Sequence, residues 1–136
     1  MYASFRKTGR FRAWLMEKAG VSLGAWGEWV ALTYFRRKGW ELVARNWTTR
    51  SGEIDLIFYD KKELVFVEVK TRRNSQAYAP EDNFNRDKLG KMESLAWSFL
   101  ERFELENTPV RYDLAAVETM DLRFYWIRHY QGLGDF

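Results

Sequence analysis

Apolar residues recur along this chain with two periods, one typical of helices and one typical of strands. Residues 24–38 follow the helical period, and Gly39 is expected to end this helix. Residues 86–103 predict a second helix of the same kind. The core-facing stripe of the first helix comprises Gly24, Glu28, Ala31, Leu32 and Phe35, and that of the second comprises Leu89, Met92, Leu95, Ala96 and Phe99.

The remaining periodic segments are short and rich in β-branched and aromatic residues, which is typical of strands. The segment 64–72 is apolar at nearly every position up to Val67, so we expect it to lie centrally in a sheet. The order helix, three strands, helix, two strands predicts an α/β or α+β domain with one mixed sheet of about five strands. The predicted strands are 40–46, 53–59, 64–72, 110–117 and 122–128, and 73–85 is predicted to be an irregular polar loop.

Length and composition fit one domain, because 136 residues of which 46% are hydrophobic can bury a sizeable core. We expect this domain to span residues 21–136. Residues 1–20 are basic and lack the apolar stretch of a secretory signal. They are interpreted as a weakly ordered or peripheral arm, in which Phe11, Trp14 and Leu15 could form one face of a short helix. No run of 18 apolar residues occurs, so no membrane-spanning helix is expected.

The chain contains no Cys and one His, His129. These counts exclude a disulfide, a zinc–thiolate site, a cysteine nucleophile and a multi-histidine metal site. A chain without Cys fits the reducing cytoplasm, which is the expected location. Any metal would be held mainly by oxygen, and oxygen ligands favour Mg²⁺ or Mn²⁺.

The candidate chemistry follows from the register of the hairpin predicted at 53–72. If the residues DKKE at 60–63 form the turn, Asp55 lies directly opposite Glu68, with Cβ atoms roughly 5 Å apart. Lys70 is two residues beyond Glu68 and therefore projects from the same face. Two carboxylates placed opposite each other are destabilising unless a cation, a shared proton or a basic group compensates. The pattern favours a divalent-ion site, and the alternative is a solvated surface cluster of Asp, Glu and Lys.

Glu28 is a further candidate, because it lies on the stripe of the first helix that otherwise faces the core. Either it contributes to a metal or water site, or it is a boundary residue that reaches solvent or bonds a backbone amide.

Basic and aromatic residues gather near these segments, and the net charge is +3 with a pI of about 9.2. Arg and Lys suit phosphate contacts, and exposed rings can stack on bases. A solvated polar face is the alternative for each residue taken alone. The candidate nucleic-acid contacts are Arg45, Trp47, Arg50, Arg72, Arg73 and Lys88.

Several motifs together resemble the YraN-like family of small bacterial proteins. They are G-E-x-x-A at 27–31, N-W followed by GEIDLI within 46–57, and VFVEVKTR at 65–72. The resemblance continues through Lys88 and the R-Y-D at 111–113, and it covers residues 24–130. That family resembles a branch of the PD-(D/E)xK nuclease superfamily, close to archaeal Holliday junction resolvases. Ile54 departs from the superfamily pattern, which has Pro before the Asp.

The resemblance implies a restriction-endonuclease-like core and a function: metal-dependent, structure-selective hydrolysis of phosphodiester bonds in DNA. It implies that Asp55 and Glu68 bind Mg²⁺ or Mn²⁺ with the carbonyl of Val69 as a third ligand. It further implies that Lys70 orients or activates water and that Glu28 holds a water at the metal. The related junction enzymes suggest a homodimer. Two alternatives remain open: a nucleic-acid-binding module that keeps the fold without cutting, and an interaction protein in which the acidic pair is structural.

Overall fold

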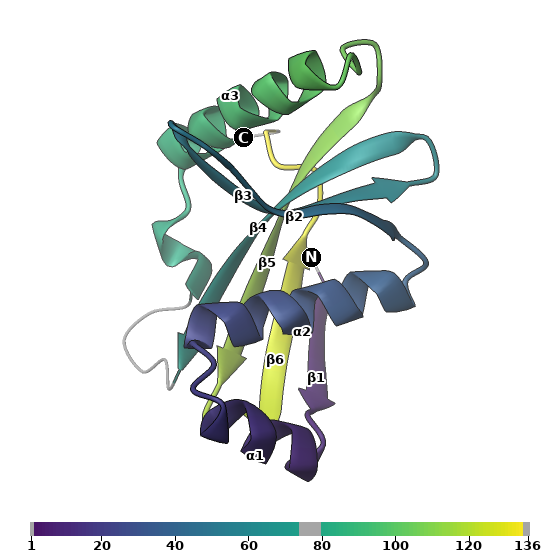
Figure 1. The fold of residues 1–136 in the computed structure, drawn as a ribbon. Helices are drawn as coiled ribbons and strands as arrows, with labels where there is room; N and C mark the ends of the chain where they lie inside the picture. The colour runs from purple at the N-terminus through teal and green to yellow at the C-terminus, as the bar shows by residue number, and fades with distance from the viewer. Residues whose placement is uncertain (1, 74–79, 135–136) are drawn as a thin grey trace.

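A computed structural model describes residues 2–73 and 80–134, without the side chains of Tyr2, Ala3, Phe5 and Pro80 (Figure 1). Its helices are α1 (Arg10–Lys18), α2 (Leu23–Arg37), α3 (Arg86–Arg102) and a short 3₁₀ helix, η1 (Pro80–Asn83). Its strands are β1 (Tyr2–Lys7), β2 (Glu41–Thr49), β3 (Gly52–Asp60), β4 (Glu63–Arg73), β5 (Val110–Thr119) and β6 (Phe124–Tyr130).

The strands form one six-stranded mixed sheet in the order β1-β6-β5-β4-β3-β2. The pair β4–β5 is parallel, and the other four pairs are antiparallel. The chain reaches the parallel strand β5 through α3, as a parallel connection requires. The sheet confirms the predicted α/β (α+β) class and the central position of β4. It is also consistent with the restriction-endonuclease-like core that the resemblance implies.

Helices α2 and α3 cover opposite faces of the sheet. Leu56, Phe58, Val65 and Val67 pack in the cluster under α2, whereas the alternate residues Ile57 and Phe66 pack under α3. In Figure 1, α3 lies at the top of the view and α2 crosses the middle, with strands between them. The central strands are therefore buried on both sides, which explains their nearly continuous apolar sequence.

The buried stripe of α2 differs from the predicted one at its start. Gly24 is exposed, whereas Trp26 and Val30 are fully buried beside Ala31 and Phe35. Ser22 caps this helix through a hydrogen bond from the Ala25 amide. Glu28 lies at the edge of the buried stripe and is half-buried.

Residues 1–20, expected to form a peripheral arm, contribute β1 and α1. Strand β1 is the outermost strand and pairs with β6 from Tyr2–His129 to Lys7–Phe124. Helix α1 buries Ala13 and leaves Phe11, Trp14 and Leu15 exposed. Residues 74–79 of the predicted loop 73–85 lie outside the described residues. Within the described part of the chain, no helix has the length and apolarity needed to cross a membrane.

Candidate active site

The hairpin of β3 and β4 has the predicted register. From Asp60–Glu63 at the turn to Leu56–Val67, each residue of β3 pairs with the residue of β4 that a DKKE turn predicts. The pairing then stops one residue before the expected pair of Asp55 and Glu68. There, Asp55 Oδ2 accepts a hydrogen bond from the Val69 amide at 2.8 Å. A side-chain carboxylate thus serves as the acceptor for a β4 amide at the point where the two strands part.

Strand β3 changes its orientation at Asp55. Ile54 and Ile57 are three residues apart, and both pack under α3, which a regular strand cannot arrange. The neighbouring strand changes at the same level, because Asn46 of β2 has a left-handed backbone (φ 49°). This shared irregularity turns polar side chains of both strands toward the end of the sheet.

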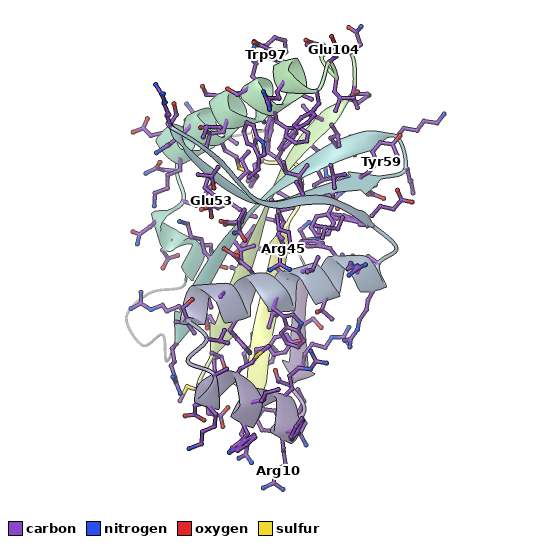
Figure 2. The ribbon with its side chains drawn as sticks, in the orientation of Figure 1. Arg10, Arg45, Glu53, Tyr59, Trp97 and Glu104 are labelled. Atoms are coloured by element: carbon purple, nitrogen blue, oxygen red, sulfur yellow. The ribbon has the colours of Figure 1, made fainter. Side chains whose placement is uncertain are left out.

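Three carboxylates meet at this irregularity. One oxygen each from Glu28 of α2 and from Glu53 and Asp55 of β3 lie within 4.8 Å of one another. Asn46 Nδ2 donates to Glu28 Oε2 at 2.9 Å and to Glu53 Oε1 at 3.3 Å, and Thr48 Oγ1 donates to Glu53 Oε2 at 3.1 Å. In Figure 2, the labelled Glu53 lies between α2 and α3.

A close contact between α2 and β4 positions Glu28. A Cβ atom built on Gly27 would lie 1.8 Å from Thr71 Oγ1 and 2.8 Å from Thr71 Cβ. Only glycine lets the helix approach the strand this closely. The glycine of the G-E-x-x-A motif thus brings the following glutamate to Asp55.

Electrostatics disfavours an ionised Asp55 in this cluster. Burial and the charge of Glu68 raise the pKa of Asp55 to about 8, against the lowering effect of the Val69 amide. Glu28 and Glu53 raise it further. At neutral pH without a cation, Asp55 is therefore mostly protonated.

Glu68 and Lys70 lie beside this cluster and face α3. Lys70 Nζ lies 3.2 Å from Glu68 Oε1. Both residues line a cavity of about 200 Å³ together with Glu53 and two lysines of α3, Lys88 and Lys91. Acids from the sheet thus face ammonium groups from the helix across one cavity.

The predicted nucleic-acid contacts lie at several different places. Lys88 lines the cavity, and Arg45 and Arg50 are exposed on β2 and in the turn after it. Trp47, by contrast, is half-buried and packs edge-on against Phe99 of α3. Arg72 and Arg73 end β4, where Arg73 Nε donates to the Met120 carbonyl oxygen at 3.2 Å.

Glu53 and Asn46 belong to the motifs GEIDLI and N-W, but the sequence patterns assign neither of them a role in the site. Glu53 stands two residues before Asp55 in the same strand, a spacing that places both on one face of a regular strand. That spacing is the signal by which the sequence could have identified Glu53 as a site residue. No pattern of the sequence identifies the left-handed backbone of Asn46.

The R-Y-D segment at 111–113 belongs to a separate, structural network. Asp113 is fully buried, accepts from Arg111 Nε at 2.9 Å, and lies 2.6 Å from His129 Nε2. Arg111 also pairs with Glu63 next to the β3–β4 turn. Burial raises the pKa of Asp113, but the hydrogen bonds from His129 and Arg111 outweigh it and leave the pKa below its usual value.

The donor set at the parting strands fits a hard divalent cation. Glu28, Glu53 and Asp55 offer only oxygen atoms, and Glu68 is close enough to act on the charge of Asp55. Mg²⁺ and Mn²⁺ prefer such ligands, and positive charge lets carboxylates this close together stay ionised.

The fold and the cluster define an α/β protein with an acidic site where two inner strands of a mixed sheet part. Residues 27–117 match the uncharacterised protein family UPF0102, and the chain belongs to this family. This membership confirms the resemblance to the YraN-like family.

Three relatives illustrate the similarity, and each is described as a UPF0102 protein. The relative from Roseiflexus castenholzii is 38% identical over 96 residues, covering 70% of this chain and 77% of the relative. The one from Beutenbergia cavernae is 36% identical over 117 residues, covering 86% and 99%. The one from Symbiobacterium thermophilum is 41% identical over 96 residues, covering 71% and 81%.

Proposed function

We propose that this protein is a metal-dependent nuclease that hydrolyses phosphodiester bonds in DNA. The observation that carries the proposal is the position of Asp55. Its carboxylate is held by the Val69 amide where β3 and β4 part, with Glu28 and Glu53 around it. Such a cluster of acids is costly unless a cation balances it.

Glu28, Glu53, Asp55 and Glu68 would hold the cation. When bound, Mg²⁺ or Mn²⁺ supplies Lewis-acid chemistry to a phosphate oxygen and lowers the pKa of water. Because Asp55 is mostly protonated without a cation, occupancy of the site is expected to release its proton. The carbonyl of Val69, which the resemblance implies as a ligand, belongs to the residue whose amide already fixes Asp55.

Lys70 would act on the reacting phosphate. Its ammonium lies beside Glu68 and lines the cavity, so it can donate a hydrogen bond to an attacking water or to a phosphate oxygen. Its positive charge would also stabilise the negative charge that accumulates in the transition state.

The lysines of α3 complete a polyanion site. Lys88 and Lys91 face the acids across the cavity, so a phosphate backbone could enter between opposite charges. These contacts reach phosphates rather than base edges, which favours selectivity for the shape of the nucleic acid over its sequence. A homodimer, as in the related junction enzymes, would place two such sites on one branched substrate.

The proposal is tested by cleavage assays with Mg²⁺ or Mn²⁺ on a panel of branched and linear DNA. Lys70→Ala should lower turnover on the order of 10²-fold or more, as expected for loss of a positioned catalytic group. Binding in the presence of a chelator should fall only modestly, because one phosphate contact among several is lost.

Lys62→Ala is the matched control, because Lys62 lies in the β3–β4 turn at the other end of the hairpin. Its turnover should equal that of the wild type. Cleavage that persists unchanged in Lys70→Ala would contradict the proposed site.

The alternative is a nucleic-acid-binding module that keeps the fold without cleavage. The hydrogen bonds of Asn46 to Glu28 and Glu53 and the ion pair of Lys70 with Glu68 favour it, because they stabilise the carboxylates without any cation. In that case the wild type binds DNA but cleaves no substrate of the panel with either metal.

A further inference from the structure

A second cavity, of about 250 Å³, lies where the end of β1 meets the start of α1 and one side of α2. Its lining includes Thr8 and Gly9 from the β1–α1 connection, Arg12 of α1, and Trp29 and Arg37 of α2. No residue that lines it carries a carboxylate. Its charge is therefore opposite to that of the acidic cluster.

The start of α1 offers unpaired donors to this cavity. Gly9 is the N-cap and provides no side-chain cap, and the first turn contains no acidic residue. The amides of the first turn have no acceptor within the helix, and the helix dipole places partial positive charge at this end. A helix N-terminus whose amides lack acceptors favours the binding of an anion.

Two guanidinium groups add full positive charge. Arg12 stacks on the ring of Trp29 at 4.8 Å from its centroid, which holds the guanidinium at the cavity. Burial raises the pKa of Tyr125, another lining residue, and the charge of Arg37 acts to lower it, so Arg37 reaches the same space. Neither Arg12 nor Arg37 pairs with a carboxylate among residues 2–73 and 80–134.

The hydroxyl of Thr8 is an independent observation at the same place. Thr8 is 3% exposed and lines the cavity, yet its Oγ1 has no hydrogen-bond partner among the residues that the structure describes. Buried hydroxyls are almost always bonded, so an unpaired one at a cavity indicates a group that the protein accepts there.

We propose that this cavity binds a phosphate group. The start of α1, two guanidinium groups and Thr8 line it together, and such a set of donors suits a tetrahedral anion with several acceptor oxygens. A water molecule occupies about 30 Å³, so the cavity has room for such an anion and its remaining waters. The group is carried either by a small phosphate compound or by a nucleic-acid strand.

The test is a titration of the ¹⁵N-labelled full chain with inorganic phosphate, followed by NMR and compared with chloride at equal ionic strength. The amides of residues 9–12 should shift and saturate with phosphate but not with chloride. Arg37→Gln should raise the dissociation constant about tenfold or more, as loss of a charge-assisted hydrogen bond implies. Arg36→Gln should leave it unchanged, because the neighbouring Arg36 does not line the cavity.

A short oligonucleotide distinguishes the two sources. If it shifts the same amides and competes with phosphate, a strand carries the group, and if only the free ion binds, a small phosphate compound does. Absent shifts at residues 9–12, or equal weakening by Arg36→Gln and Arg37→Gln, would overturn the proposal. The titration uses neither divalent metal nor cleavage, so its result is independent of the proposed nuclease function.

Discussion

Asp55 is the residue on which the chemistry of the acidic site depends. Its carboxylate is half-buried, receives the Val69 amide, and lies among three other acids. Because its folded pKa of about 8 exceeds the value of roughly 3.9 in an unfolded chain, the folded state binds a proton more tightly. The free energy of unfolding of the metal-free protein should therefore fall as the pH rises through this window.

Asp55→Asn should remove this contribution. In the presence of a chelator, the variant should be more stable than the wild type at pH 8, by ~1–3 kcal/mol after solvent screening is considered. The difference should vanish toward ~pH 3, where the carboxyl group is protonated in both the folded and the unfolded wild type. Thermal unfolding of both proteins from about pH 3 to pH 9 measures it, and a difference that does not depend on pH would contradict the assigned pKa.

The same pair of proteins tests the metal site. Mn²⁺ in large excess should stabilise the wild type, by about 2.7 kcal/mol at a concentration 100 times the dissociation constant. It should leave Asp55→Asn nearly unchanged. Equal stabilisation of the two proteins would place the metal elsewhere.

At this scale the sequence predicted part of the site. Asp55, Glu68 and Lys70 follow from the register of one hairpin, because a short turn fixes which residues face each other. Asn46 did not follow, because its position depends on the irregularity that turns β2 and β3 over at Asn46 and Asp55, whereas the spacing of two residues from Asp55 could have identified Glu53. A rule of strict alternation cannot describe a strand that changes faces.

Helix α2 is the element that joins the two parts of the acidic cluster. It packs against β4 through Gly27, and it carries Glu28 to the residues that β3 contributes. Its position is fixed by the buried side chains Trp26, Val30 and Phe35 under the same face. A displacement of this helix would move Glu28 relative to Asp55.

Gly27→Ala should produce such a displacement. The added methyl group would overlap Thr71, and overpacking of this kind costs about 1–3 kcal/mol. Metal affinity should fall as well, because Glu28 moves with the helix. Chemical denaturation and Mn²⁺ titration measure the two effects.

Gly24→Ala is the control in the same helix, because no atom lies within 4 Å of a Cβ built there. It should leave metal affinity unchanged and stability equal or higher, since alanine favours helix more than glycine. If both variants lost metal affinity equally, the contact with Thr71 would not be the cause.

The elements themselves were largely predictable. Both long helices and the five strands after residue 20 correspond to the patterns that predicted them, with ends shifted by a few residues. Strand β1 was not predicted, because the sequence YASFRK has no clear alternation of its own and the strand is completed by its hydrogen bonds with β6. The parallel pairing of β4 with β5 follows from the intervening helix.

At the scale of the whole molecule, the acids at the parting strands lie within a protein of net positive charge. The net charge is +3, and Lys88 and Lys91 of α3 face Glu53 and Glu68. A polyanion would be repelled by the acids alone, so binding requires these cations. A Cβ on Gly52 would lie 3.1 Å from Lys91 Cε, so this glycine leaves space for the lysine beside the site.

Replacing both lysines of α3 tests this division of charge. Lys88→Gln with Lys91→Gln should weaken binding to every DNA sequence and reduce the slope of log affinity against log salt by roughly 2, since each lost phosphate contact contributes about 0.9. Fluorescence anisotropy in a chelator, at several salt concentrations, measures affinity without cleavage. The control, Lys61→Gln with Lys62→Gln, removes the same charge from the β3–β4 turn at the far end of the hairpin. Because long-range attraction to the net charge is equal in the two double variants, a difference in slope can come only from local contacts. An equal loss of slope would mean that DNA is attracted by the overall charge, and that the cavity beneath α3 does not contact the backbone.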